Sequence, residues 1–200
     1  MNRLVLASNN PGKLREIGAL LAPLAIEVVA QAELKIGEAD EPHVTFLENA
    51  LAKARHASRA SGLAALADDS GLCVEALGGE PGVHSAYYAG REGSREQRDR
   101  RNNEKLLMSL STERKAYYCC AMVLVRHPAD PRPLVAEGIW RGEIARAPRG
   151  SSGFGYDPLF LLPERGKTAA ELDPAEKNRI SHRGIALQKL LVLLNEADRR

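Results

Sequence analysis

The sequence predicts an α/β fold, a mixed β-sheet flanked by helices, within a single domain of residues 1–200. Its 200 residues are enough for one compact domain, or for one domain with two lobes across a cleft. Predicted strands and helices alternate early in the chain, whereas strands cluster later, and this order favours a mixed sheet. No internal repeat or linker divides the sequence.

The first thirty residues predict a strand, a helix and a second strand. Residues 3–7 are apolar and end abruptly at polar residues, which is typical of a buried strand. Apolar residues then recur at helical spacing over 14–21, and Pro23 closes that helix. A second strand is predicted over 26–30. The irregular segment after it is acidic because it contains Glu38, Asp40 and Glu41.

A capping box predicts the start of the next helix. Thr45 and Glu48 have the spacing at which each side chain satisfies an amide of the other, and the alanine-rich helix ends at Gly62. Residues 63–67 then predict a small buried strand. We expect this strand to stop at a turn over residues 68–71, because they are polar and end in glycine.

The middle of the chain predicts a long loop, a charged helix and a strand pair. A strand is expected over 72–77, and the glycine-rich segment 78–93 predicts an exposed loop. Residues 94–109 predict a helix whose arginines form a solvated face. The strongest strand signal covers 116–125, and its partner strand is predicted over 134–141.

The last fifty residues predict a flexible loop, a strand and two helices. Residues 150–155 predict the loop and 159–162 the strand. Asp173 followed by proline predicts a helix start. The final helix has one apolar stripe that we interpret as core packing, made by Leu187, Leu190, Leu191 and Leu194.

Composition excludes several classes of protein. Apolar residues make up 44% and charged residues 27%, which are ordinary globular values and argue against disorder. The longest apolar run, 116–125, has about half the length of a membrane span, and the first residues do not resemble a signal peptide. A net charge of +2 does not favour binding to a nucleic acid polymer. Because Cys73, Cys119 and Cys120 make no disulfide framework, we expect reduced thiols in a soluble, cytoplasmic protein.

Polar residues surround the start of the first predicted helix. Ser8, Asn9 and Asn10 precede it, and Lys13 follows within its first turn. Exposed amides at a helix N-terminus, together with a lysine, form an anion site suited to phosphate. The segment lacks the glycine and lysine spacing of a P-loop, and a simple capping turn explains it as well.

Two adjacent carboxylates follow the predicted strand 63–67. Asp68 and Asp69 would repel each other at close range, and a divalent metal or a role as base would relieve that repulsion. The acidic segment with Asp40 and Glu41 offers a further ligand, and oxygen ligands select Mg²⁺ or Mn²⁺ over zinc. An acidic surface turn is the alternative interpretation.

A third cluster lies in the C-terminal half. It comprises Phe154, Gly155, Tyr156, Asp157, Lys177, Ser181, His182 and Arg183. An aromatic face with nearby donors suits a flat heterocycle that presents hydrogen-bond acceptors. A core phenylalanine and an ordinary helix cap would explain the same residues. Taken together, the three clusters predict that the protein binds a nucleotide and catalyses a reaction at its phosphates.

The sequence resembles the inosine triphosphate pyrophosphatase family, the XTP/dITP diphosphatases. The matching strings run in family order over nearly the whole chain: Leu6-Ala7-Ser8-Asn9-Asn10-Pro11-Gly12-Lys13, Thr45-Phe46-Leu47-Glu48-Asn49-Ala50, Ala67-Asp68-Asp69-Ser70-Gly71-Leu72, Asn102-Asn103-Glu104-Lys105-Leu106-Leu107, Gly153-Phe154-Gly155-Tyr156-Asp157-Pro158, Gly166-Lys167-Thr168-Ala169-Ala170-Glu171-Leu172 and Ser181-His182-Arg183-Gly184. Ser8 and Asn9 stand where the family often has threonine and glycine, and serine keeps the hydroxyl.

This resemblance implies a Mg²⁺-dependent enzyme that hydrolyses deaminated purine nucleoside triphosphates to the monophosphate and pyrophosphate. The implied substrates are ITP, dITP, XTP and dXTP, and their removal cleanses the nucleotide pool. The family fold is an elongated mixed α/β structure of two lobes with the substrate in the central cleft. Its members are usually homodimers.

The resemblance also implies roles for the matching positions. Asp69 accepts the proton of the attacking water and helps to hold Mg²⁺, with Asp68 and Glu41 as further metal contacts and Asp40 as an alternative to Glu41. Phe154 stacks on the purine, and donors at the base edge favour a keto oxygen over the amino group of adenine. The implied substrate-binding residues are Ser8, Asn9, Asn10, Pro11, Gly12, Lys13, Ser70, Phe154, Gly155, Tyr156, Asp157, Lys177, His182 and Arg183.

Three other interpretations remain open. A non-catalytic nucleotide sensor would keep the phosphate and base clusters but would not need the pair Asp68 and Asp69. An RNA-binding protein would use the arginine-rich helix 94–109, although no aromatic ribonucleoprotein motif accompanies it. Among enzymes, the Maf-type pyrophosphatases are the nearest alternative, and the strings around Phe154 and Arg183 favour the inosine triphosphate enzymes.

Overall fold

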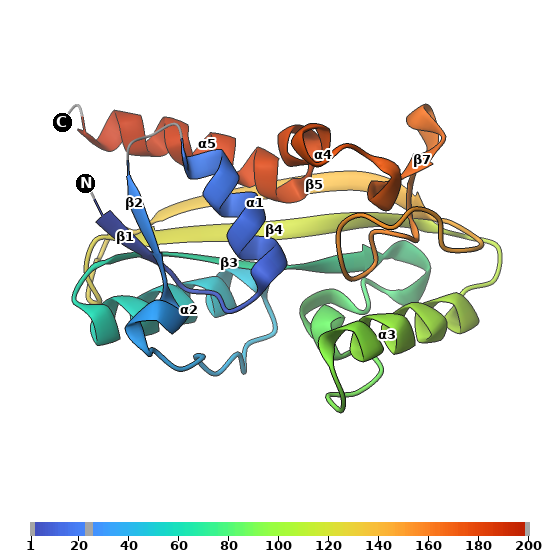
Figure 1. Ribbon diagram of the computed structural model, residues 1–200, viewed down its shortest axis with the longest axis horizontal. Helices are drawn as coiled ribbons and strands as arrows, with labels where there is room; N and C mark the ends of the chain where they lie inside the picture. The colour runs from blue at the N-terminus through green and yellow to red at the C-terminus, as the bar shows by residue number, and fades with distance from the viewer. Residues whose placement is uncertain (1–2, 23–25, 199–200) are drawn as a thin grey trace. The chain divides into compact units, whose positions relative to one another are not determined.

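The computed structural model describes residues 3–22 and 26–198 and has a mixed seven-stranded sheet with flanking helices (Figure 1). The strand order is β2-β1-β3-β4-β5-β6-β7. β1 (Arg3–Leu6) pairs in parallel with both β2 (Glu27–Ala30) and β3 (Ala64–Val74). The predicted fold class, a mixed sheet flanked by helices, is confirmed.

The other end of the sheet is antiparallel. β4 (Lys115–Val125) lies between β3 and β5 (Leu134–Ile144) in the strand order. β6 (Phe160–Leu162) pairs antiparallel with β5 on one side and with β7 (Lys167–Thr168) on the other. The strand pair that the sequence predicts in this region is present, and β5 continues to Ile144.

The chain divides into two compact units. Unit 1 consists of the described parts of Met1–Asp69, Cys120–Gly138 and His182–Arg200. Unit 2 consists of Ser70–Cys119 and Ile139–Ser181. The boundaries between the units fall inside β3, β4 and β5, so each of these strands contributes residues to both units.

In unit 1, helices cover both faces of the strands. α1 (Pro11–Leu21) and α5 (His182–Asp198) lie on one face, and α2 (Phe46–Ser61) lies on the other (Figure 1). Alternate strand residues therefore enter two separate cores. The core beneath α1 and α5 includes Leu4, Leu6, Ile17, Leu66, Met122 and Leu187. The core against α2 includes Val5, Ala50, Ala54, Ala65, Ala67 and Val123.

Unit 2 has one core, which contains an aromatic group. The rings of Tyr118 and Phe160 lie 4.6 Å apart, and those of Trp140 and Phe160 lie 5.0 Å apart. α3 (Arg95–Ser109) contributes Leu106 to this core. α4 (Pro174–Ile180) begins at the predicted cap, where the Asp173 side chain accepts from two backbone amides.

The predicted turn over residues 68–71 is wrong. β3 continues without interruption from Ala64 to Val74, and Asp68 and Asp69 are both buried within it. Polar residues persist in this strand because charged side chains from neighbouring helices compensate the two carboxylates, as the candidate site below describes. The strand predicted over 72–77 accordingly ends at Val74, where a 3₁₀ turn begins.

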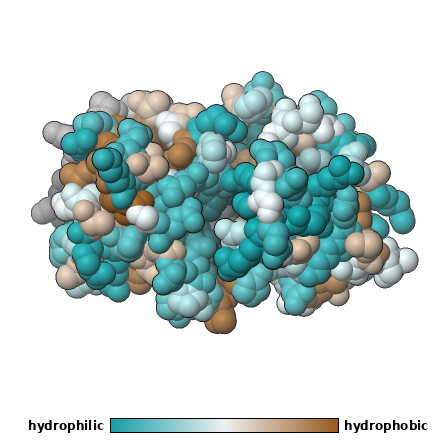
Figure 2. Space-filling model, turned by 60° about the horizontal axis from the view of Figure 1, so that its bottom comes forward, coloured by the Kyte–Doolittle hydropathy of each residue, from teal (hydrophilic) through white to brown (hydrophobic). Residues whose placement is uncertain are grey.

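Other details of the chain agree with the sequence. The Thr45 hydroxyl accepts from the amide of Glu48, which confirms the predicted cap, whereas Pro23 lies outside the described residues. The three cysteines are free thiols. In Figure 2 the visible face is mainly hydrophilic, with apolar patches that are small and separate. None of the helices formed by residues 3–22 and 26–198 is long and apolar enough to cross a membrane.

Candidate functional site

The loop between β1 and α1 is held in place by its own side chains. Asn10 is the N-cap of α1, and its Oδ1 accepts from the amides of Gly12 at 2.9 Å and Lys13 at 3.2 Å. The Ser8 hydroxyl accepts from the amide of Asn10 at 3.2 Å. The exposed residues Asn9 and Pro11 complete the loop. The predicted capping turn and the predicted anion site therefore occupy the same segment.

Asp68 belongs to the face of β3 that α1 and α5 cover. Its Oδ2 lies 2.9 Å from Lys13 Nζ and 3.3 Å from Arg183 Nε, and its side chain is fully buried. Arg183 also pairs with Glu16 of α1, with 2.9 Å between Nη1 and Oε2. Burial opposes ionisation of Asp68, but attraction to Lys13 and Arg183 outweighs it and lowers the pKa of Asp68. The lowered pKa favours the charged form of this carboxylate, which pairs with two cations.

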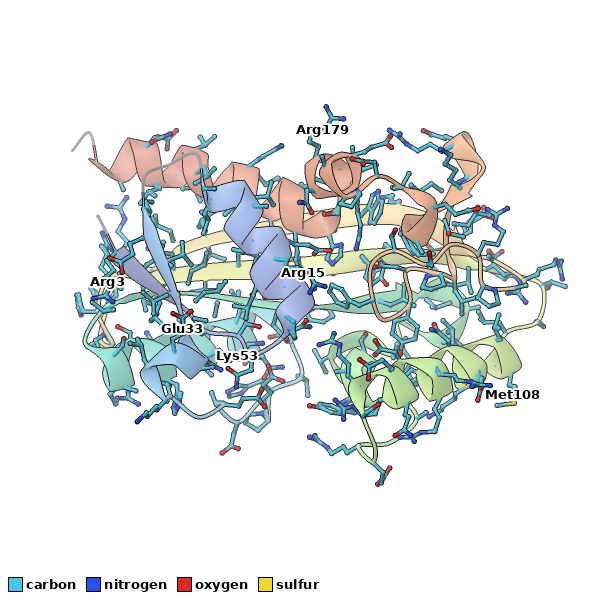
Figure 3. All side chains as sticks on the ribbon, in the orientation of Figure 1. Arg3, Arg15, Glu33, Lys53, Met108 and Arg179 are labelled. Carbon is cyan, nitrogen blue, oxygen red and sulfur yellow. The ribbon has the colours of Figure 1, made fainter. Side chains whose placement is uncertain are left out.

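Asp69 belongs to the opposite face of β3, which α2 covers. Its Oδ1 lies 2.9 Å from Lys53 Nζ, and the same ammonium lies 2.5 Å from Glu41 Oε1. Lys53 extends from α2, as the labelled side chain in Figure 3 shows. Burial raises the pKa of Asp69, and Lys53 and Lys13 only partly offset this effect. The pKa of Lys53 is raised, because its attraction to the carboxylates outweighs the cost of burial.

Consecutive residues of one strand point to opposite faces, and this alternation separates the two aspartates. Asp68 has an environment that stabilises its charge, whereas Asp69 has one that favours the neutral acid more than usual. A carboxylate with a raised pKa is better suited to accept a proton. The repulsion that the sequence analysis assumed between the two groups does not organise the site.

One oxygen of Asp69 is open to a further ligand. Its Oδ2 is buried, and no described residue makes a hydrogen bond to it. Glu41 is more than one-third exposed and shares Lys53 with Asp69, whereas Asp40 is exposed and makes no polar contact with another described residue. Among residues 3–22 and 26–198 there is no group of three or more acidic, histidine or cysteine side chains placed to hold a metal. The donors fit a Mg²⁺ ion that takes most of its ligands from phosphate and water.

The segment that carries Glu41 is anchored by Asn49. The Asn49 Oδ1 accepts from the amide of His43 at 3.1 Å, and its Nδ2 donates to the His43 carbonyl at 3.2 Å. Asn49 is buried at the start of α2. These two hydrogen bonds hold the backbone of His43 against α2, the helix that also carries Lys53. Glu41 is only two residues away from His43.

In unit 2, the loop from Gly153 to Asp157 is organised by a buried ion pair. Asp157 Oδ2 accepts from Lys177 Nζ at 2.7 Å and from the Phe154 amide at 2.8 Å. Both charged side chains are nearly fully buried. Gly153 has a φ of +79°, and a Cβ at this position would lie 2.1 Å from the same carboxylate oxygen. The Asp157 carboxylate therefore fixes the conformation of the loop and leaves no room for a side chain at position 153.

α3 supports the same loop from the other direction. Asp99 Oδ2 accepts from the Gly155 amide at 2.9 Å, and Asn103 Nδ2 donates to the Gly155 carbonyl at 2.9 Å. The Phe154 ring lies near two cations, at 4.9 Å from Arg95 Cζ and 5.2 Å from Lys177 Nζ. The Phe154 ring therefore lies beside two cations, each of which also pairs with an aspartate that contacts the loop.

The structure places eight of the predicted site residues in two clusters. In unit 1, Lys13, Asp68 and Arg183 form one ion-pair network, and Asp69 and Glu41 share Lys53. In unit 2, Phe154, Asp157 and Lys177 form the second cluster. The sequence predicts one cluster that contains both Lys177 and Arg183, whereas the structure assigns these residues to different units.

Three further predicted site residues lie outside these two clusters. Tyr156 is buried in the core of unit 2, and its hydroxyl donates to the Ser85 carbonyl at 2.9 Å. Ser70 is half-buried on β3, directly after Asp69. His182 is buried at the first position of α5. The substrate-binding roles of all three remain predictions.

Sequence reasoning missed Lys53, Glu16, Arg95, Asp99 and Asn103. A signal for Lys53 is present in the sequence, because it lies one turn from Ala50 and Ala57 on the face of α2 that packs on the sheet. A single lysine within a buried alanine stripe needs a carboxylate partner. The sequence predicts a solvated face for the arginines of α3, and it gives no signal that Asp99 and Asn103 of the same helix hold Gly155.

Comparison with known proteins places this arrangement in a family. Residues 4–193 match the Ham1 family. A dITP/XTP pyrophosphatase from Nitrosomonas europaea is 63% identical over 200 residues, which are 99% of this chain and 97% of that protein. A dITP/XTP pyrophosphatase from Burkholderia pseudomallei is 62% identical and covers 98% and 94% of the two chains. The structure of a HAM1 protein from Coxiella burnetii has a TM-score of 0.89 at 48% identity and covers 98% of this chain and all of that one. The chain belongs to the Ham1 family.

Proposed function

We propose that this chain hydrolyses dITP and XTP between the α- and β-phosphates and releases a nucleoside monophosphate and pyrophosphate. It is a nucleoside triphosphate pyrophosphatase, as the names of its curated relatives indicate. The observation that carries the proposal is Asp69, a buried carboxylate with a raised pKa and one oxygen that no described residue occupies. Such a group is suited to take a proton from an attacking water.

The charges of unit 1 favour a substrate that arrives with a divalent cation. Two separate ion-pair networks there contain three cations and four carboxylates in total: Lys13, Arg183, Asp68 and Glu16 in one, and Lys53, Asp69 and Glu41 in the other. A triphosphate alone would meet a cluster whose own charge is not positive. Mg²⁺ would be held by Asp69 and Glu41, and when bound it would neutralise charge on the phosphates and the leaving pyrophosphate.

The protein groups then have separate tasks. The amide end of α1 and Lys13 attract the phosphates, and Asp68 fixes the position of Lys13 through its 2.9 Å contact. Lys53 holds Oδ1 of Asp69, which leaves Oδ2 to accept the proton of water. Positioning of the water in line with the scissile bond supplies most of the acceleration in such reactions.

The cluster of unit 2 suits the base. Phe154 offers a ring for stacking, and Lys177 and Arg95 place positive charge beside it. Keto purines present an oxygen at position 6, whereas adenine presents an amino group that cannot accept from these donors. We therefore extend the proposed substrates to ITP and dXTP and expect ATP to be a poor substrate.

A panel of nucleoside triphosphates tests the proposal directly. The purified protein is given ITP, dITP, XTP, GTP or ATP with Mg²⁺, and monophosphate, pyrophosphate and orthophosphate are measured. We expect monophosphate and pyrophosphate in equal amounts from ITP, dITP and XTP, and loss of turnover when the metal is chelated. Release of orthophosphate alone, or no turnover of keto purines, would overturn the proposal. Tight binding of ITP without turnover would favour the nucleotide sensor instead.

Two further properties belong to the same proposal. The role in the nucleotide pool would place the protein in the cytoplasm. We also propose that the chain forms a homodimer, as the resemblance implies. Sedimentation equilibrium at micromolar concentration measures the mass directly, and a monomer at the concentrations used in the assay would reject the homodimer without affecting the proposed activity.

A further inference from the structure

We propose that Arg95 contacts the purine and favours bases with a keto oxygen at position 6. This inference rests on the proposed function, because it assigns a new base-contacting residue to the same site. Arg95 is the first residue of α3, within unit 2. Its guanidinium carbon lies 4.9 Å from the centre of the Phe154 ring. A base stacked on that ring would lie within reach of the guanidinium.

The guanidinium of Arg95 makes only one ion pair with the described residues, and that contact is long. Within the part of the chain that the structure describes, its only ion pair is with Asp99, and the distance from Nε to Oδ2 is 3.8 Å. That oxygen already accepts from the Gly155 amide at 2.9 Å. No hydrogen bond joins the Arg95 guanidinium to another described residue, although its side chain is only one-third exposed. Its planar set of N–H groups is therefore available to a ligand.

Lys177 does not have the same freedom. Its ammonium lies 2.7 Å from Asp157, and both side chains are almost completely buried. Asp157 also accepts from the Phe154 amide, so movement of Lys177 toward a base would disturb the loop. Of the two cations near the Phe154 ring, Arg95 is the one that can change partners at low cost. Exchange of the long contact with Asp99 for contacts with a base would leave Asp99 bonded to Gly155.

The chemistry of guanidinium determines which bases it favours. Two of its N–H groups match the pair of acceptors O6 and N7 on one edge of a keto purine. Adenine carries an amino donor at position 6 and offers only N7 on that edge. Arg95 would thus select hypoxanthine, xanthine and guanine together against adenine. Exclusion of guanine would require a different group near position 2.

Kinetics with Arg95→Ala and three triphosphates test this role. The substrates are ITP, ATP and purine riboside triphosphate, which has only hydrogen at position 6. For Arg95→Ala we expect kcat/KM for ITP to fall about tenfold or more, with little change for the other two substrates. Arg95→Lys keeps the charge but lacks the planar pair of donors, so the preference for ITP should also fall.

Arg100→Ala is the matched control. Arg100 is on the same helix and carries the same charge, but it is exposed and pairs with Glu104. We expect this variant to keep the wild-type ratio of kcat/KM for ITP to ATP. An unchanged ratio in Arg95→Ala, or an equal loss with all three substrates, would overturn the assignment of Arg95. Failure of the wild-type protein to release pyrophosphate from ITP would instead overturn the proposed function.

Discussion

Lys53 Nζ lies 2.9 Å from Asp69 Oδ1, and this contact determines which oxygen of the aspartate remains open. The same ammonium contacts Glu41 at 2.5 Å, so one cation orders both groups that we propose as metal ligands. Its raised pKa keeps it charged throughout the neutral range. Lys53 thus prepares the carboxylates before any substrate is bound.

Lys53→Met tests this relationship. The substitution keeps much of the volume of the side chain and removes the charge, which leaves Asp69 and Glu41 to repel each other. We expect kcat with ITP to fall at least about 100-fold, the usual size of the loss of one well-placed electrostatic group. Arg59→Ala, an exposed change on the same helix, should keep normal turnover. Near-normal kcat in Lys53→Met would contradict the role of the ammonium.

Asp69→Asn and Asp68→Asn should have different consequences, although the residues are adjacent. Asp69→Asn keeps the shape of the side chain but removes the proton acceptor, so turnover should fall by about 100-fold or more while the fold is retained. Asp68→Asn removes the anion that Lys13 and Arg183 share, and it should lower the free energy of unfolding by about 3 kcal/mol. Turnover assays and urea denaturation of both variants measure these effects. Equal stability losses would contradict the separation of their roles.

The buried position of Arg183 predicts that its substitution lowers the stability of the protein as well as its preference for ITP. From the sequence, loss of Arg183 is expected to weaken the preference for ITP over ATP. In the structure the guanidinium is buried between Asp68 and Glu16, so Arg183→Ala should also destabilise unit 1 by about 3 kcal/mol or more. Glu16→Gln removes only one partner and should have a smaller effect on thermal unfolding. A fully stable Arg183→Ala variant would contradict the structural role.

The sequence predicts the elements and motifs of this protein well because hydrophobic period and caps are local signals. Helix starts at Thr45 and Asp173 follow directly from side chains that bond the nearest amides. The turn at 68–71 was predicted wrongly because burial of Asp68 depends on Arg183, 115 positions away. Side chains from such distant positions compensate a buried charge in ways that local composition does not reveal.

The sequence predicts the site residues that belong to a recognisable motif. It does not predict the partner residues that reach the site only through the packing of a helix. Lys53 and Asp99 belong to helices that carry many exposed polar residues, and the sequence does not mark which of their polar side chains turn inward. Their contacts with Asp69 and Gly155 come from the way each helix lies against its unit. The sequence therefore predicted the groups that could react, but not the groups that orient them.

Gly153→Ala should disturb the loop that carries Phe154. The backbone at Gly153 has a φ of +79°, and an added Cβ would meet Asp157 Oδ2 at 2.1 Å. Backbone strain costs about 1–3 kcal/mol, and displacement of Asp157 would also release Lys177. We expect KM for ITP to rise more than kcat falls. Gly166→Ala is the matched control, because it has a φ of +62° with nothing near its Cβ. Similar kinetics for the two variants would show that the contact with Asp157 is not needed.

Asp130 gives unit 1 a stability that depends on pH. Its carboxylate accepts from the Arg126 side chain at 2.8 Å, from the Arg126 amide and from the Arg132 amide, each at 2.9 Å. The side-chain hydrogen bond from Arg126 is the largest cause of the lowered pKa of Asp130. A carboxyl with a lowered pKa in the folded state contributes stability above its unfolded pKa of about 4 and loses it as pH falls through the folded value.

Asp130→Asn should therefore destabilise the protein by about 2 kcal/mol near neutral pH. Since protonation removes the same charge from the wild-type protein, the difference between the two should shrink below about pH 4. Urea denaturation at a series of pH values measures this difference, and Asp173→Asn, which keeps a capping oxygen on an exposed helix end, serves as the control. A difference that stays constant or grows in acid would mean that Asp130 stabilises the turn by packing and not by its charge.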